Sequence, residues 1–475
     1  MKMAQFREQK HVRGLSTRPS PEGDYSSAFA EHTALYRIPD GVLSHMFIVG
    51  QNHVTVPSSE GHVKTKSLPF ELLVSHVNRR WRCVAIGTCS LWRRVAVIPE
   101  KATEETQTYL RRSKSHPTEI RVDGWPWEHP MPLALVAPLA QNIKCWRRAV
   151  INVSLEYPNH LLLDHLAKYP TILMHLDYIS LDVEVVNYPP GYPTLEPGPI
   201  QILKLGTPRL EFVRLRGVAP QFFRPPMATV VTLHIELTKD IPFSYNTLKD
   251  LLTASPTLTN FSLYGDLLHF PDWPAPGAEL IRLPGLKSLR LWGTHGWIYS
   301  NVLRRILAPA LLSLYLKEVQ ETDLEPFWVS TACNNFPSVR ELTFCDFDFS
   351  ALSYYKAYAA FPHITKLTVL NTTFDIPIIV TLLGHRSANA RIWPQLRELS
   401  VPYDTTDDQQ LYDMVALRSE VRAPLSKLRI CTDRPLPTLL GMVAIQRYVE
   451  VETFDEPRQW PEGVDHIDED DVFFQ

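Results

Sequence analysis

The chain has 475 residues, of which 48 are basic and 51 acidic, so its formal net charge is −3. This near balance argues against a protein that coats nucleic acid, because such proteins carry a basic surplus. A hydrophobic fraction of 45% is enough for a buried core. The longest strongly apolar stretch, residues 133–140, is far too short to cross a bilayer. We therefore expect neither nucleic acid nor a membrane as a partner.

The N-terminal segment and the cysteines bear on the compartment. Residues 1–14 contain no apolar run of the kind that a signal peptide needs. Residues 1–33 are polar and without periodicity, so we expect them to be disordered. None of the six cysteines forms a Cys-x-x-Cys pair, and we interpret them as reduced thiols. These features predict an intracellular protein, in the cytoplasm or the nucleus.

Residues 34–98 predict a small helical module. Pro39 suits the first turn of a helix whose apolar face has i, i+3, i+4 spacing. The residues of that face are Val42, Leu43, Met46 and Phe47. After a loop over residues 50–66, one longer helix is predicted to begin behind Ser67 and to end at Gly87. Its apolar positions are Phe70, Leu73, Val74, Val77, Trp81, Val84 and Ala85.

This module resembles an F-box, with the loop 50–66 inserted between its two halves. The matching segments are Ile38-Pro39-Asp40-Gly41-Val42-Leu43 with Met46-Phe47, then Val77-Asn-Arg79-Arg80-Trp81-Arg82-Cys-Val84-Ala85, then Leu91-Trp92. The layout is similar to that of the many F-box proteins of mushroom-forming fungi, which continue with irregular repeats. The alternative interpretation is an amphipathic helical cap, which a repeat array needs at its end in any case.

The rest of the chain repeats a short pattern of an apolar residue, two further residues, an apolar residue, one residue and an apolar residue. The middle apolar residues of eleven such units are Ala149, Ile179, Val213, Leu233, Phe261, Leu289, Leu314, Leu342, Leu367, Leu399 and Leu428. Their mean spacing of about 28 residues falls within the period of leucine-rich repeats. We therefore predict an irregular leucine-rich-repeat solenoid over residues 99–455, followed by an acidic tail over residues 456–475.

Each unit predicts a short strand and a return segment. Seven units carry a proline two residues before the first apolar position: Pro208, Pro256, Pro284, Pro309, Pro337, Pro362 and Pro394. Proline ends a helix and favours extended backbone in the residue before it, so it should close the return segment. Residues 301–307 and 409–418 are typical of helical returns. The predicted fold class is α/β, a helical F-box-like module followed by short parallel strands with helical or loop returns.

The strand pattern also predicts a binding face. Polar residues between the buried positions should face the open, concave side, and neighbouring strands lie about 4.8 Å apart. Five of them form the candidate substrate-binding patch, with Tyr264, Trp292 and Lys317 in one row and Arg290 and Tyr315 beside it. Exposed tyrosine, tryptophan and arginine are the residue types of interaction hot spots. The other interpretation is ordinary packing between successive repeats.

The resemblance implies a function without catalysis. F-box proteins join Skp–cullin–F-box ubiquitin ligases, where the helical module binds the small adaptor subunit and the repeats hold a substrate protein. The positions that match the adaptor-facing surface are Ile38, Pro39, Val42, Leu43, Met46 and Phe47.

Two other functions remain open. One is a leucine-rich-repeat interaction scaffold with no role in ubiquitin transfer, and the other is an enzyme built on an atypical repeat array. The sequence contains no nucleotide-binding glycine loop, nucleophile motif or zinc-protease motif. We therefore expect no enzyme, no metal and no cofactor.

Overall fold

The computed structural model of the chain describes residues 37–54, 68–97, 103–123, 133–154, 161–184, 199–236, 245–265, 279–293, 296–370, 376–387, 391–402, 408–431 and 442–454. The predicted disordered segment 1–33 and the predicted acidic tail 456–475 lie outside these residues, as does most of the predicted loop 50–66. The chain divides into two compact units, Met1–Leu91 and Trp92–Gln475, so the first strand after the helical module belongs to the second unit.

The first unit is a bundle of three short helices, α2 (Asp40–Val54), α3 (Phe70–Val77) and α4 (Arg79–Gly87), followed by the 3₁₀ turn η1 (Cys89–Trp92). The prediction of one long second helix is wrong, because the chain breaks at Asn78. Asn78 has extended backbone (φ −158°, ψ 176°), and its side chain accepts a 2.8 Å hydrogen bond from the Trp81 amide. This asparagine thus ends one helix and caps the next.

The interior of this unit is built around α2. Leu43 and Phe47 are buried, and the Phe47 ring lies 5.1 Å from that of Trp81. The helix continues past the predicted loop start at Gly50, where a side chain would meet the Phe70 ring at 2.6 Å. One turn further, the buried Gln51 amide donates hydrogen bonds to a Glu71 carboxylate oxygen and to the Leu91 carbonyl.

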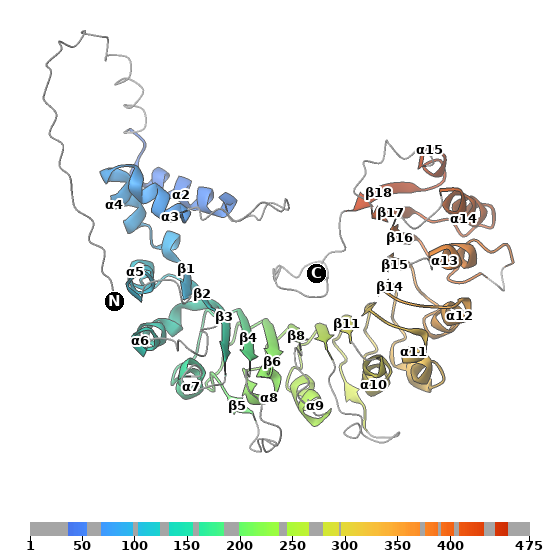
Figure 1. Cartoon of the computed structure of the whole chain (residues 1–475), viewed down its shortest axis with the longest axis horizontal. Coiled ribbons are helices and arrows are strands. Elements are labelled where there is room, and N and C mark those ends of the chain that lie inside the picture. The colour runs from blue at the N-terminus through green and yellow to red at the C-terminus, as the bar shows by residue number, and fades with distance from the viewer. Residues whose placement is uncertain are drawn as a thin grey trace, which may run out of the picture. The chain divides into compact units, whose positions relative to one another are not determined.

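The second unit is built on one parallel sheet of 14 strands, which follows the inner side of the arc in Figure 1. In sheet order the strands are β1 (Arg94–Val97), β2 (Thr118–Val122), β3 (Trp146–Ser154), β4 (Tyr178–Glu184), β6 (Phe212–Gly217), β8 (Thr232–Glu236), β9 (Asn260–Tyr264), β11 (Ser288–Trp292), β13 (Ser313–Lys317), β14 (Glu341–Cys345), β15 (Lys366–Leu370), β16 (Glu398–Pro402), β17 (Lys427–Cys431) and β18 (Glu450–Phe454).

The strand register confirms the eleven predicted units. Each middle apolar residue pairs with the next, so that Ala149 to Leu428 form one continuous row across the sheet. Three further strands extend the array, β1 and β2 before it and β18 after it. Their residues Val95, Ile120 and Val451 continue the same row.

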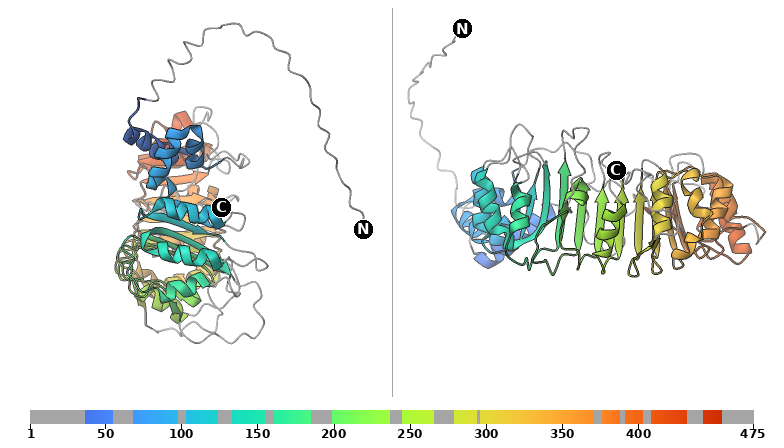
Figure 2. Two further views of the ribbon diagram at one scale, coloured as in Figure 1. Left: turned by 90° about the vertical axis from the view of Figure 1, so that its left-hand side faces the viewer. Right: turned by 90° about the horizontal axis from the view of Figure 1, so that it is seen from below.

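Helices fill most of the return segments and cover the outer face of the sheet (Figure 2). They are α5 (Thr103–Ser113), α6 (Leu133–Asn142), α7 (Leu161–Lys168), α8 (Ala219–Phe222), α9 (Tyr245–Thr253), α10 (Trp297–Arg305), α11 (Glu321–Trp328), α12 (Ala351–Ala360), α13 (Ile376–Leu383), α14 (Asp408–Glu420) and α15 (Met442–Ile445). The 3₁₀ turns η2 (Ile143–Cys145) and η4 (Thr331–Asn335) and two strand pairs, β5 (Ile200–Gln201) with β7 (Phe223–Arg224) and β10 (Ile281–Arg282) with β12 (Ile306–Leu307), complete the returns.

The core lies between the sheet and these returns. In β11 the alternating residues Leu289 and Leu291 are fully buried, as the pattern predicts. The helical return predicted over residues 409–418 lies within α14, and that predicted over residues 301–307 overlaps α10, which ends at Arg305 where β12 begins. Among the described residues, no helix is long and apolar enough to span a membrane.

One glycine fixes the end of a strand. Gly217, the last residue of β6, has a φ of +65°, and a Cβ there would lie 2.3 Å from the Val183 carbonyl oxygen. A larger residue would push β4 and β6 apart, so this close approach requires glycine.

Candidate functional site

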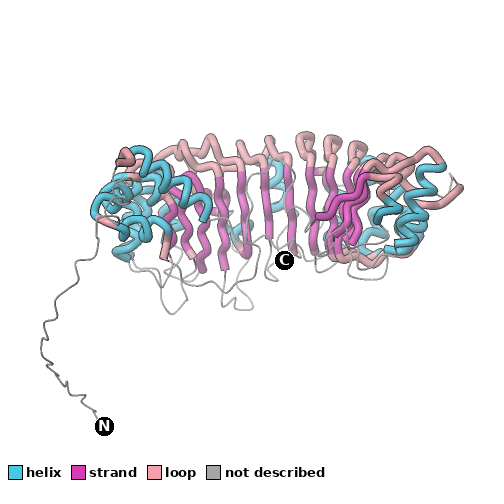
Figure 3. The backbone as a smooth tube through the Cα atoms, turned by 90° about the horizontal axis from the view of Figure 1, so that it is seen from above, coloured by secondary structure: helices cyan, strands magenta, loops and turns pink. Residues whose placement is uncertain are grey.

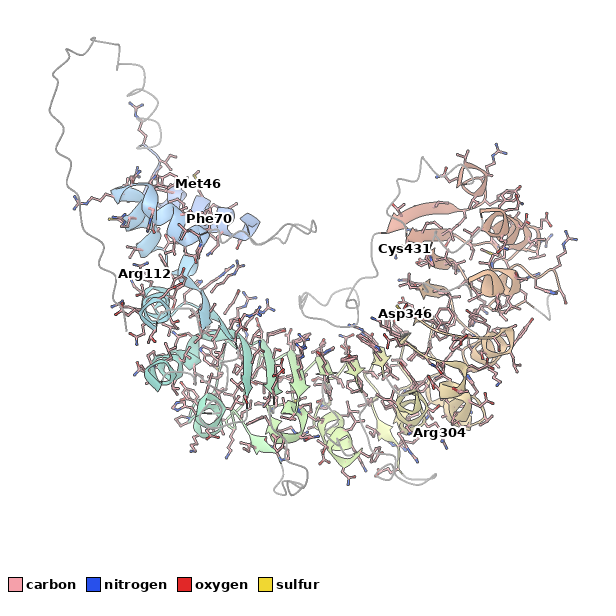
Figure 4. The ribbon with its side chains drawn as sticks, viewed as in Figure 1. Met46, Phe70, Arg112, Arg304, Asp346 and Cys431 are labelled. Atoms are coloured by element: carbon pink, nitrogen blue, oxygen red, sulfur yellow. The ribbon has the colours of Figure 1, made fainter. Side chains whose placement is uncertain are left out.

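The register places the five residues of the candidate substrate-binding patch together, as predicted. Trp292 pairs with Tyr264 on one side and with Lys317 on the other. In the neighbouring row Arg290 pairs with Tyr315. Figure 4 shows side chains from both faces of the sheet, including those that project from the inner face.

Cations and aromatic rings stack on one another within this patch. The Lys317 ammonium lies 3.9 Å from the centroid of the Trp292 ring, and the Tyr264 ring lies 4.1 Å from it. The Arg290 guanidinium lies 5.7 Å from the centroid of the Tyr315 ring. These are cation–π distances, and such contacts are worth more when they are removed from water.

The expected exposure of this patch is wrong for three of its five residues. Arg290, Tyr315 and Lys317 are only 3%, 7% and 5% exposed, whereas Tyr264 and Trp292 are half-buried. Strands this close bring long side chains of successive repeats into contact, so the packing between repeats that we kept as the alternative describes the three buried residues. The two rings are the part of the patch that a partner could touch directly.

Burial also shifts the pKa values of two side chains in this region. Burial raises the pKa of the Tyr315 hydroxyl far above its ordinary value. Burial, and then the Asp346 charge, raise the pKa of the neighbouring Cys345 thiol to about 12. Because the thiolate is the reactive form of cysteine, this shift disfavours reaction of Cys345 at neutral pH.

A buried ionic cluster lies next to the patch, on β4, β6 and β8. The carboxylate of Glu236 is fully buried and lies 2.7 Å from Arg214 and 2.9 Å from Arg216. Arg216 also lies 3.5 Å from Asp182, and His234 lies 3.6 Å from Glu236. The alternation of the strands predicts the inner face for Arg214, Arg216, His234 and Glu236, but it does not predict that one carboxylate holds two arginines.

The pKa values of the two acids of this cluster, Glu236 and Asp182, are shifted in opposite directions. Burial alone would raise the pKa of Glu236, but His234 and Arg214 hold it below its ordinary value. Burial raises the pKa of Asp182 to about 6, and Arg216 offsets only part of that effect. Glu236 is therefore ionised at neutral pH, and Asp182 gains a proton in mildly acidic solution.

Because the pKa of Asp182 is raised, we expect Asp182→Asn to increase the free energy of unfolding relative to wild type, by an amount that depends on pH. The folded protein disfavours the charged form, so wild type loses stability as the pH rises between the unfolded and the folded pKa. Relative to the variant, the free energy of unfolding of wild type should fall by about 2–3 kcal/mol between about pH 4 and pH 7. Urea unfolding of both proteins across this range measures the difference, and a constant difference would contradict the assignment.

The candidate adaptor-binding residues divide between the interior and the surface of the first unit. Leu43 and Phe47 are buried in its core, whereas Val42 and Met46 are 50% and 49% exposed. Pro39 is exposed and Ile38 is half-buried. Figure 4 labels Met46 on α2. A partner can therefore reach four of the six residues directly.

Most exposed apolar residues of this unit lie on two helices, apart from Leu68 before α3 and Ile86 on α4. Val42, Met46 and Val49 follow each other on α2 at helical spacing, and Leu73 and Val77 do so on α3 with exposures of 47% and 57%. We call these five residues the outer apolar residues. Sequence reasoning missed Val49, Leu73 and Val77 as surface residues, because periodicity alone does not say which of two apolar faces is buried.

The start of α2 is fixed by an arginine of α4. Arg80 donates a 2.6 Å hydrogen bond to the Asp40 carboxylate and another to the Ile38 carbonyl. Asp40 occupies the first turn of α2, where a negative charge is favourable. Ile38, Pro39 and Val42 are thereby held next to a folded helix end.

Among the described residues, no group of histidine, cysteine or acidic side chains could hold a metal ion. No protein-family model matches the sequence, and no curated protein matches it. The solved structure of the leucine-rich-repeat-containing protein LegL7 from Legionella pneumophila is similar over 74% of this chain and 97% of that chain, with 15% identity and a TM-score of 0.37. Our description of the repeats rests on the strand register and not on this similarity.

Proposed function

We propose that the chain is the substrate-recognition subunit of a Skp–cullin–F-box ubiquitin ligase. The first unit binds the small adaptor subunit, and the repeats bind a substrate protein. One observation carries the proposal: a compact helical unit with several half-exposed apolar side chains precedes a long parallel repeat array. The F-box-like sequence pattern of residues 38–92 supports the same interpretation.

The outer apolar residues support a protein partner for the first unit. Isolated surface apolar side chains are common, but five on two short helices of one small unit are typical of an interaction surface. A helix that presents residues at i, i+4 and i+7 can place them in a groove of the partner. Val42, Met46 and Val49 have this spacing.

The mechanism that follows is positional. The chain tethers a substrate close to a ubiquitin-conjugating enzyme, and the high effective concentration accelerates transfer. No side chain of the chain takes part in bond making.

An adaptor pull-down with the full chain tests the proposal. We expect wild type to capture the purified adaptor subunit and Val42→Asp with Met46→Asp to lower capture by about tenfold or more, because both side chains lose apolar contacts. Both residues are about half exposed, so the variant should keep its fold. The buried Leu43 and Phe47 are unsuitable, because a charge there would unfold the unit.

A matched control separates the adaptor contact from general surface effects. Val329→Asp with Leu352→Asp changes two apolar residues of the repeat returns that are 76% and 58% exposed. We expect this control to capture the adaptor like wild type. Absence of capture by folded wild type would reject the ligase role and leave the second candidate function, a repeat scaffold for protein interaction.

A further inference from the structure

Three exposed apolar side chains lie on two adjacent turns that lead into β4 and β6. Ile172, Met174 and Leu205 are 47%, 57% and 55% exposed. The two turns are joined by a 3.2 Å hydrogen bond from the Leu173 amide to the Gly206 carbonyl. We call these three residues the rim apolar residues, because the turns before the strands form one rim of the sheet.

The backbone holds the rim apolar residues outward. Leu173, between Ile172 and Met174, is fully buried, so its two neighbours must point to solvent. Leu205 follows the buried Leu203, which has a φ of +51° and whose amide donates a 3.0 Å hydrogen bond to the Leu166 carbonyl. A non-glycine residue in this conformation is strained, and the surrounding bonds maintain it. The exposure of Leu205 is therefore built into the turn.

Three cations lie within four residues of these side chains along the chain. Lys168, Lys204 and Arg209 are exposed, and none of them forms an ion pair with a residue that the structure describes. Of the acids in these two turns, Asp177 lies 2.9 Å from Arg147 and is thus already neutralised, which leaves Glu211. This part of the rim is positively charged although the whole chain has a net charge of −3.

Further cations stand at the same rim along the array. Lys287, Arg340 and Arg397 are the residues directly before β11, β14 and β16, and Arg340 and Arg397 are each followed by a glutamate, Glu341 and Glu398. Their amides join the backbone ladder between neighbouring turns, for example from Arg340 to the Leu312 carbonyl. These turns run nearly level along the upper edge of the sheet in Figure 3 and along the lower edge in the right-hand view of Figure 2.

We propose that this rim docks on an anionic membrane surface. The rim apolar residues would enter the boundary between headgroups and acyl chains, while the lysines and arginines stay among the anionic headgroups. A level rim with single apolar side chains on its turns suits a flat, fluid surface better than a folded acidic partner. Our expectation of no membrane partner rested on the lack of a spanning segment, which surface docking does not require.

Vesicle co-sedimentation of the full chain tests the proposal. Wild type should sediment with phosphatidylcholine vesicles that contain phosphatidylserine, and not with phosphatidylcholine alone. Lys204→Gln with Arg209→Gln should weaken binding by about fivefold for each cation removed. Met174→Ser with Leu205→Ser should weaken binding as well, and both variants change exposed residues only.

Leu352→Ser provides the matched control, since it removes an apolar residue that is 58% exposed, in the first turn of α12 and not in a turn before a strand. It should bind like wild type. The proposal fails if phosphatidylserine does not increase vesicle binding of wild type, or if either rim variant binds like wild type. It also fails if the control loses as much vesicle binding as the rim variants. None of these outcomes depends on adaptor binding.

Discussion

Arg418→Ala is expected to lower the free energy of unfolding by about 3–5 kcal/mol, because it leaves several buried carbonyl groups without a donor. Arg418 is fully buried, and its guanidinium donates 3.2 Å hydrogen bonds to the carbonyl oxygens of Leu383, Trp393 and Leu396. Burial, and then the neighbouring Arg391, lower the pKa of Arg418 to about 10. The residue is therefore still a cation at neutral pH and joins two return segments from the end of α14.

Urea unfolding and hydrogen exchange over residues 391–431 measure this effect. Because each repeat contacts mainly its neighbours, the loss should concentrate in the C-terminal repeats. Glu420→Ala, at an exposed position of the same helix, is the control and should change stability by less than about 0.5 kcal/mol. If Arg418→Ala matched that control, the arginine would not support the returns.

Glu236→Gln is expected to destabilise the protein by a similar amount, about 3–5 kcal/mol, since it removes one partner of a buried ion pair. The variant leaves Arg214 buried and Arg216 partly buried beside a neutral amide. Glu341→Gln is the matched control, because its ion pair with Lys366 is long and half exposed. That control should change stability by about 1 kcal/mol or less.

A double-mutant cycle separates the carboxylate from simple packing. Arg214→Met keeps the apolar stem of the side chain and removes the charge that Glu236 neutralises. If the interaction between the two charges causes the destabilisation, Glu236→Gln should lower the free energy of unfolding by less in the Arg214→Met background than in wild type. Equal losses in both backgrounds would show that the two side chains contribute independently.

The repeat architecture could be predicted because the strand positions depend on local alternation. A residue such as Leu289 is apolar, and its polar neighbours identify the face that it occupies. The strands β2 and β18 were missed, because they lie outside the recognised units. Residues 91–97 do predict a turn into a strand, but this strand, β1, was assigned to the helical module and not to the array. The break at Asn78 was also missed, since the apolar spacing continues across it.

Burial of charged side chains could not be predicted from the pattern. Arg418 lies on a helix face that, by residue type alone, would be assigned to solvent, and its partners are carbonyls distant in sequence. Lys317 was placed in the correct row, but the register does not say what covers a side chain. The sequence therefore predicts where the candidate patch lies but not how exposed its residues are. It likewise predicts the helix α2 but does not distinguish its buried face from its exposed face.

The strict register of the sheet contrasts with the uneven spacing of the repeats. The interval from Ile179 to Val213 is 34 residues and that from Val213 to Leu233 is 20, yet all three residues lie in one row. Insertions and deletions are thus confined to the returns, and the inner face keeps its geometry. Genes for such arrays can gain, lose or resize whole units, so the recognition surface can diversify while each remaining strand stays in register with its neighbours.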